Sequence, residues 1–351
     1  MVSPYRNLPA RQYWKSAASR AGLALSELYV PRNRLRPEDL IATAGSCFAQ
    51  HISRFLLRAG CKVLDVEPPP FGLDGALARR FGYGLYSARY GNIYCARQLL
   101  QLIRESLGQI QPQNLAWERQ GRWHDALRPS VEPEGLDSPD EVIAHRADHM
   151  RRLRGMFEAA DVLIFTLGLT EAWVRSSDGL VFPSAPGTLA GCYSPEAHAF
   201  KNFDVGEVVA DLVEIRRLLQ GLSPGLRIIL SVSPVPLAAT ASGRHVLVAN
   251  AYSKAVLRAA AGEACRRFED LDYFPAYEII ATPVLGRDAY QDDHRTVTPE
   301  GVARVMSVFL SAHGLDDSCA DDRTDASDRL LPASEEDDVI CEEALLGAFS
   351  P

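Results

Sequence analysis

The stretch Leu40-Ile41-Ala42-Thr43-Ala44-Gly45-Ser46-Cys47-Phe48-Ala49 decides the fold of this chain. Its first five residues are apolar or β-branched and predict a buried strand, and Gly45-Ser46 predicts a turn. Apolar residues then recur at helical spacing as far as Leu56, and Gly60 is a natural helix end. A buried strand that leads directly into a helix is typical of the βα units of a parallel sheet.

The rest of the chain repeats this alternation of short apolar runs and helical patterns. We expect further strands at 61–66, 161–167 and 227–232, helices at 96–106, 139–160, 249–268 and 299–312, and a hairpin at 171–182. Asp204 and Glu207 form an N-cap pair that predicts the start of another helix. Residues 108–137 are rich in Gln, Trp, Arg and Pro and predict a long ordered loop or insertion.

The charge of the chain is unevenly distributed. The 351 residues carry a formal charge of −8, and twelve acidic against two basic side chains after Leu315 account for −10 of it. The remaining body is therefore near +2, which excludes a strongly basic nucleic-acid binder. The 47% apolar content excludes wholesale disorder.

The composition also indicates where the protein works. Residues 1–20 lack the apolar core of a signal peptide, and no apolar run approaches the roughly 20 residues of a membrane span. Seven cysteines without CxxC spacing or a His/Cys ladder favour free thiols in a reducing cytoplasm over a metal site. His145 and His149 have a spacing that can hold zinc, but arginines follow them and favour a solvated helix face.

Ser46 is the first candidate for chemistry. It follows a buried strand and opens a helix, where backbone N–H groups and the helix dipole favour a developing negative charge. The carboxyl ends of parallel strands are also where open α/β sheets bind ligands. Two alternatives remain: Ser46 could be an N-cap, and Cys47 is a rival nucleophile that is more consistent with packing inside the helix.

Several blocks of sequence resemble the GSCFA family, which is similar to the SGNH hydrolases. They occur in the expected order over roughly residues 38–312, as Gly45-Ser46-Cys47-Phe48-Ala49, Arg89-Tyr90-Gly91-Asn92-Ile93-Tyr94, Thr166-Leu167-Gly168-Leu169-Thr170-Glu171-Ala172-Trp173, Ser231-Val232-Ser233-Pro234-Val235-Pro236-Leu237 and Asn250-Ala251-Tyr252-Ser253-Lys254. The resemblance implies an α/β fold with three α/β/α layers, a flavodoxin-like parallel sheet and loop insertions. We expect an N-terminal extension at 1–37, one domain at 38–315 and an acidic disordered tail at 316–351.

The resemblance also implies roles for individual residues. Ser46 matches the serine that attacks an ester or acyl group, and its backbone N–H would contribute to an oxyanion hole. Gly91, next to Asn92, matches the second donor block. In the third block, Gly168-Leu169-Thr170-Glu171 stands where the family of SGNH enzymes has GxND, so Thr170 occupies the Asn position and offers one hydroxyl donor.

The base is the least determined part of this resemblance. The DxxH motif of SGNH enzymes falls on Asp293-His294-Arg295-Thr296, which keeps the Asp but places Thr296 in the His position. His294, next to Asp293, and His245, after the fourth strand, are the two candidate bases, and the absence of any working His base is a third possibility. Asp292, Asp293 or Glu171 would orient the histidine that is used, by analogy with a catalytic triad.

Two functions from different classes follow. The first is a serine esterase or O-acyltransferase that acts through a Ser46 acyl-enzyme on an O-acylated small molecule, glycan or lipid-linked precursor, without metal or other cofactor. The second is a catalytically reduced module that binds a glycan or acyl ligand. Neither involves nucleic acid or a membrane span. The insertions at 108–137 and 172–203 are the expected pocket walls, and their tryptophans are candidates for packing or stacking.

Overall fold

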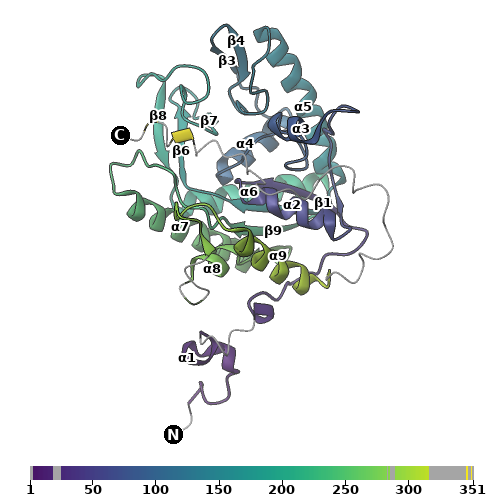
Figure 1. Ribbon diagram of the computed structural model, residues 1–351, viewed down its shortest axis with the longest axis vertical. Coiled ribbons are helices and arrows are strands. Elements are labelled where there is room, and N and C mark those ends of the chain that lie inside the picture. The colour runs from purple at the N-terminus through teal and green to yellow at the C-terminus, as the bar shows by residue number, and fades with distance from the viewer. Residues whose placement is uncertain are drawn as a thin grey trace.

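A five-stranded parallel sheet forms the centre of the protein (Figure 1). The computed structural model describes residues 3–18, 25–282, 284, 289–315, 345–346 and 349. The strands are β1 (Leu40–Gly45), β2 (Lys62–Val63), β5 (Val162–Leu167), β9 (Arg227–Val232) and β10 (Leu271–Phe274). Their order is β10-β9-β5-β1-β2, and every neighbouring pair is parallel. This is the flavodoxin-like order, in which the chain changes direction across the sheet between β1 and β5.

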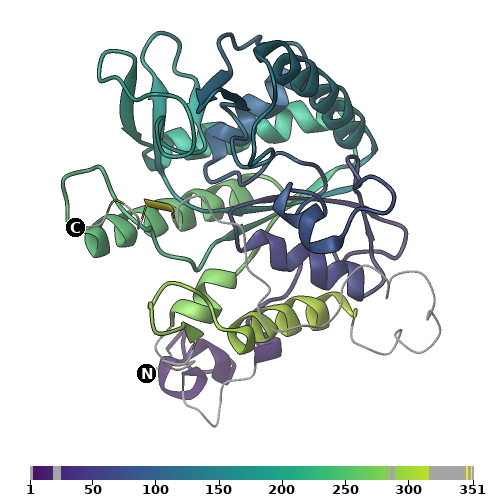
Figure 2. The ribbon, with the colours of Figure 1, turned by 45° about the horizontal axis from the view of Figure 1, so that its top comes forward.

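Helices cover both faces of this sheet, which confirms the predicted three-layer α/β/α fold. One face packs on α4 (Ala96–Ser106), α5 (Pro139–Ala159), α6 (Val205–Leu222) and α7 (Val246–Arg267). The other packs on α2 (Ala49–Arg58), α8 (Ala276–Ala281) and α9 (Pro299–His313). In Figure 2 the yellow-green α9 and the blue-green α5 lie on opposite sides of the sheet. Alternate residues of β5 serve the two cores, because Leu163 and Phe165 face one layer and Val162 and Ile164 the other.

Three helix starts that were predicted from capping residues are confirmed, whereas α7 begins at Val246, three residues before its predicted start. Ser138 caps α5 by accepting a hydrogen bond from the Glu141 N–H, with Pro139 at the first helical position. Asp204 and Glu207 form a capping box at the start of α6. Thr298 caps α9 in the same way as Ser138 caps α5.

Two antiparallel sheets extend from the parallel one. A hairpin of β3 (Ala116–Arg119) and β4 (Arg122–Asp125) lies inside the region predicted only as a loop or insertion. A three-stranded sheet consists of β6 (Glu171–Arg175), β7 (Val181–Phe182) and β8 (His198–Asn202), of which the β6–β7 hairpin was predicted. The sequence patterns did not predict β8, β10, α8 or the short α3 (Gly75–Arg80).

The segment before β1 contributes side chains to the core. Short turns of helix occur at η1 (Ala10–Gln12), α1 (Trp14–Ala17) and η2 (Leu25–Glu27). Tyr29 and Leu35 of the N-terminal extension are buried in the core beneath the sheet. Of the segment predicted to be a disordered tail, residues 316–344 lie outside the described residues. None of the helices in the described part of the chain has the length and apolarity needed to cross a bilayer.

Candidate active site around Ser46

Ser46 lies at the carboxyl end of β1, at the point where the strand order reverses. The residue is only 2% exposed. Its N–H donates to the Thr166 carbonyl at 3.0 Å, and its own carbonyl accepts from the Ala49 N–H at 2.8 Å. The Ser46 Oγ has no hydrogen-bond partner among the described residues, and the N-cap of α2 is Phe48. The hydroxyl therefore does not cap the helix, and the backbone N–H is already engaged with β5.

Gly45 allows this close approach of β1 and β5. Its φ of +145° lies in a region that side-chain-bearing residues rarely adopt. A Cβ at this position would be 2.5 Å from the Thr166 carbonyl oxygen and 2.8 Å from the Thr166 nitrogen. The glycine before the serine is thus required by sterics, and it sets the position from which Ser46 projects.

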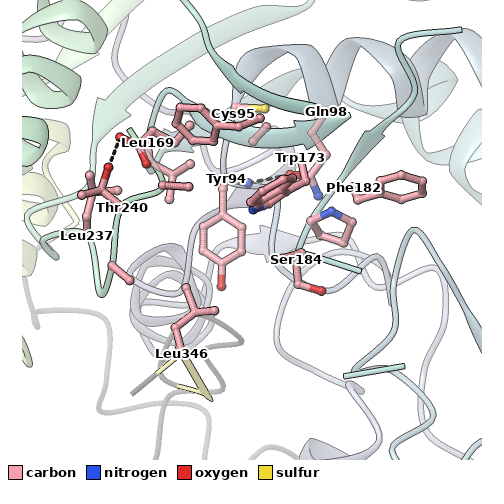
Figure 3. Close-up of a pocket in the computed structure, with 17 residues that line it drawn as sticks. Tyr94, Cys95, Gln98, Leu169, Trp173, Phe182, Ser184, Leu237, Thr240 and Leu346 are labelled. Carbon is pink, nitrogen blue, oxygen red and sulfur yellow. Dashed lines mark hydrogen bonds between the residues drawn. The ribbon is translucent and has the colours of Figure 1, made fainter. Parts of the chain in front are cut away.

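Ser46 opens into a small cavity that adjoins a larger one. The small cavity has room for about one water and is lined by Ser46, Cys47, Tyr94, Gly168, Leu169, Ser233, Val235 and Leu237. The larger cavity, of about 250 Å³, shares Tyr94, Leu169 and Leu237 with it (Figure 3). Cys47 is 4% exposed, so the rival nucleophile is also in this wall. The serine cavity and a space large enough for a small ligand therefore adjoin at these three side chains.

The residues predicted to donate to an oxyanion are near Ser46 but are engaged with other groups. The Tyr86 hydroxyl lies within hydrogen-bonding distance of both the Asn92 Oδ1 and the Ser46 carbonyl. Asn92 and Gly91 line a different small cavity. The Thr170 hydroxyl donates to the Asn202 Oδ1 at 2.7 Å. Asn92 and Thr170 therefore support the loops around the serine, and neither side chain is hydrogen-bonded to the Ser46 hydroxyl.

Glu171 lies in the wall of the larger cavity. It is the first residue of β6, and its Oε1 accepts a hydrogen bond from the Thr240 hydroxyl at 2.7 Å. Burial raises the pKa of the Glu171 carboxyl, and the hydrogen bond from Thr240 partly offsets this effect. The carboxyl is thus hydrogen-bonded to the loop that follows β9, which also lines the larger cavity.

His245 is the N-cap residue of α7. It is exposed, and its Nδ1 accepts a hydrogen bond from the Leu247 N–H at 3.2 Å. In a neutral ring the proton is then on Nε2, which can donate but cannot accept. A ring held in this way is a poor general base.

His294 lies in a loop that is fastened to the wall of the serine cavity. The Asp293 carboxylate accepts hydrogen bonds from the Thr296 N–H and hydroxyl and from the Arg295 N–H. Arg295 in turn donates to the Pro236 carbonyl at 3.1 Å, between the cavity residues Val235 and Leu237. His294 itself is exposed and has a φ of +52°. A left-handed backbone is uncommon for residues other than glycine, although His adopts it more often than most. No histidine ring is within hydrogen-bonding distance of the Ser46 Oγ among the described residues.

Two other residues were misjudged or missed. Lys254, on α7, is 1% exposed, and its Nζ donates to the Gly168 carbonyl at 2.7 Å. It therefore holds the loop that faces Ser46; the sequence placed it in the last of the family-like blocks but indicated no role for it. His149 is fully buried and contacts Glu67 at 2.8 Å, so its interpretation as a solvated residue was wrong. The acidic partner is 82 positions away in the sequence.

The fold and this serine define an α/β protein with a cavity at the switch point of a flavodoxin-like sheet. The chain belongs to the GSCFA family, whose family model matches residues 40–309. A search of curated proteins finds no match. A comparison with solved structures finds a carbohydrate esterase of family 3 from Talaromyces cellulolyticus, with 13% identity over 61% of this chain and 87% of that one, and a TM-score of 0.27. Another is described as a GDSL-like lipase from Parabacteroides merdae, with 12% identity over 80% of this chain and 98% of that one, and a TM-score of 0.32.

Proposed function

We propose that the protein is a serine esterase or O-acyltransferase that forms an acyl-enzyme on Ser46. The observation that carries this proposal is the Ser46 hydroxyl, which is buried at the switch point and has no hydrogen-bond partner in the described part of the chain. A buried polar group that is left unpaired is costly, and a catalytic role is one of the recognised reasons for retaining such a group.

His294 is the base that the geometry favours. Its loop is anchored on the segment that lines the Ser46 cavity, whereas the His245 Nδ1 is occupied as a helix cap. In the proposed step the Ser46 Oγ attacks the carbonyl carbon of the ester while His294 takes the hydroxyl proton. The ester C–O bond then breaks, and the leaving alcohol takes the proton from His294. Water or an acceptor hydroxyl then attacks the acyl carbonyl carbon while His294 takes its proton. The bond to the Ser46 Oγ breaks, and Ser46 recovers a proton from His294.

Asp293 is assigned to positioning in this mechanism, because its carboxylate already accepts hydrogen bonds from the loop that carries His294. With the Ser46 N–H bonded to Thr166, the oxyanion would need donors from the loops that hold Gly91, Asn92 or Thr170. A small rearrangement on substrate binding is therefore part of the proposal, as is common for sites observed without ligand.

Labelling with a fluorophosphonate probe tests the serine. Mass spectrometry should find the adduct on Ser46, and Ser46→Ala should abolish both the adduct and the turnover of p-nitrophenyl esters. His294→Ala should slow labelling by at least a hundredfold, whereas the matched variant His245→Ala should slow it less than tenfold. Activity that survives Ser46→Ala but is lost in Cys47→Ala would transfer the nucleophile to Cys47.

The second candidate function is a binding module that no longer turns its ligand over. The specific observation in its favour is that no histidine lies within hydrogen-bonding distance of the Ser46 Oγ in the described residues. A wild-type protein that neither labels nor hydrolyses any ester of a broad panel, yet binds an acyl ligand, would establish this alternative.

A further inference from the structure

The larger cavity next to Ser46 has an apolar wall contributed by several separate elements. Trp173 comes from β6, Phe182 from β7 and Phe200 from β8, and Leu169 and Leu237 come from the loops after β5 and β9. Its volume of about 250 Å³ is just below the roughly 300–1,000 Å³ of pockets for drug-sized ligands. The cavity thus suits a small and largely apolar ligand. Figure 3 shows Leu169 and Leu237 on one side of Tyr94, and Trp173 and Phe182 on the other.

The polar side chains of the wall are largely committed to the protein itself. The Gln98 amide donates to the Asn92 carbonyl at 2.9 Å and accepts from the Tyr94 N–H at 2.9 Å. The Thr240 hydroxyl donates to Glu171 at 2.7 Å. In the described part of the chain, Ser184 is the cavity residue whose buried hydroxyl has no hydrogen-bond partner. Together with the remaining acceptor capacity of the Glu171 carboxylate, this one hydroxyl replaces only part of the water that a sugar ring with several hydroxyls would lose, so the wall disfavours a glycan.

An aliphatic side chain of the protein already lines this cavity. Leu346, near the C-terminus, is one of the lining residues, and Figure 3 shows it below Tyr94. Leu346 is 31 positions beyond Leu315, the last described residue of the body, so its presence there is not a consequence of local chain geometry. A branched hydrocarbon group is therefore compatible with the wall.

We propose that this cavity binds the aliphatic chain of the acyl group that Ser46 accepts, a chain of medium length, and that it does not bind a sugar. The inference rests on the proposed function in one respect only, namely that the acyl carbonyl is placed at Ser46. Tyr94, Leu169 and Leu237 belong to both cavities, so a chain that lies in the larger one can place its carbonyl end at the serine.

A chain-length series tests this with the full-length protein. With p-nitrophenyl esters from acetate to dodecanoate, kcat/KM should rise about fourfold per methylene, then fall once the chain outgrows the cavity. Ala185→Trp fills the cavity from its wall and should lower the octanoate-to-acetate ratio of kcat/KM at least tenfold. The matched control Ala210→Trp, on the exposed side of α6, should leave the ratio unchanged, and melting curves check that both variants fold.

Binding to a protein without the nucleophile separates this inference from the proposed function. Calorimetry with Ser46→Ala should detect octanoate binding that weakens at least tenfold when Ala185→Trp is added, and glucose should not bind. Octanoate binding without any ester turnover in the wild type would refute the proposed function and support this inference. Equal kcat/KM for acetate and octanoate, or octanoate binding that is absent or insensitive to Ala185→Trp, would overturn the inference.

Discussion

Gly168→Ala is the substitution that most directly probes the packing around the nucleophile. A Cβ on Gly168 would lie 2.9 Å from the Ser46 Cβ, and 3.2 Å from both the ring and the carbonyl oxygen of Tyr94. Carbon atoms in ordinary contact are about 3.5–4.0 Å apart, so Ser46 and Gly168 must separate by roughly 0.6–1 Å. A displacement of about 1 Å in an active site can cost around a hundredfold in rate.

The same crowding has a cost in stability. Overpacking of this kind typically destabilises by about 1–3 kcal/mol, which for a domain of this size corresponds to roughly 2–6 °C in melting temperature. Gly155→Ala is the matched control, because Gly155 is on α5 with nothing within 4 Å of the added methyl. A helical Gly→Ala change should raise stability by up to about 1 kcal/mol and leave activity unaltered.

The assay follows the rate of Ser46 labelling by the fluorophosphonate probe together with thermal melting. We expect Gly168→Ala to label ten- to a hundredfold more slowly and to melt below the wild type, and Gly155→Ala to do neither. If Gly168→Ala labels at the wild-type rate and melts like Gly155→Ala, the argument from close packing is refuted.

Three further predictions concern the rest of the fold. Gly45→Ala should lower the free energy of unfolding by more than about 3 kcal/mol, because it combines backbone strain with a clash against β5. Urea unfolding should show a much smaller loss for Gly60→Ala, where no atom lies within 4 Å of the added methyl. Burial lowers the pKa of His149 to about 4. The unfolded chain therefore binds this proton first, near pH 6.5, and the free energy of unfolding should fall as pH falls from about 6.5 to about 4, by up to roughly 1.4 kcal/mol per pH unit; a His149→Gln variant with the same pH profile would contradict this. Deletion of residues 316–351 should leave a folded domain with a formal charge near +2, and a truncated protein without a cooperative melting transition would show otherwise.

The sequence predicted the central fold because its signals are local. The run 40–44 is short, largely apolar and followed by Gly45, and the caps at Ser138, Asp204 and Thr298 act within three residues of themselves. These features indicate a strand or helix start without knowledge of the remaining chain.

The features that the sequence did not predict depend on distant partners. β10 is only four residues long and is stabilised by pairing with β9. His149 can be buried because Glu67 lies beside it, and Lys254 can be buried because its Nζ donates a hydrogen bond to the Gly168 carbonyl. The position of Ser46 was predictable, but the engagement of its N–H with Thr166 depends on how closely β1 and β5 approach. Of the two predicted pocket walls, 172–203 lines the larger cavity and the β3–β4 region does not.

The β6–β7–β8 sheet leaves the domain and returns to it at a single point. Glu171 pairs with Asn202, and the Phe203 N–H donates to the Thr170 carbonyl at 2.9 Å, so the excursion begins and ends side by side. Such a closed excursion is a natural unit of exchange, because replacing it leaves the two chain ends at Thr170 and Phe203 adjacent and the five parallel strands in register. Chimaeras joined at Thr170 and Phe203 would thus be a direct route to altered ligand preference, with the serine and the sheet that supports it left in place.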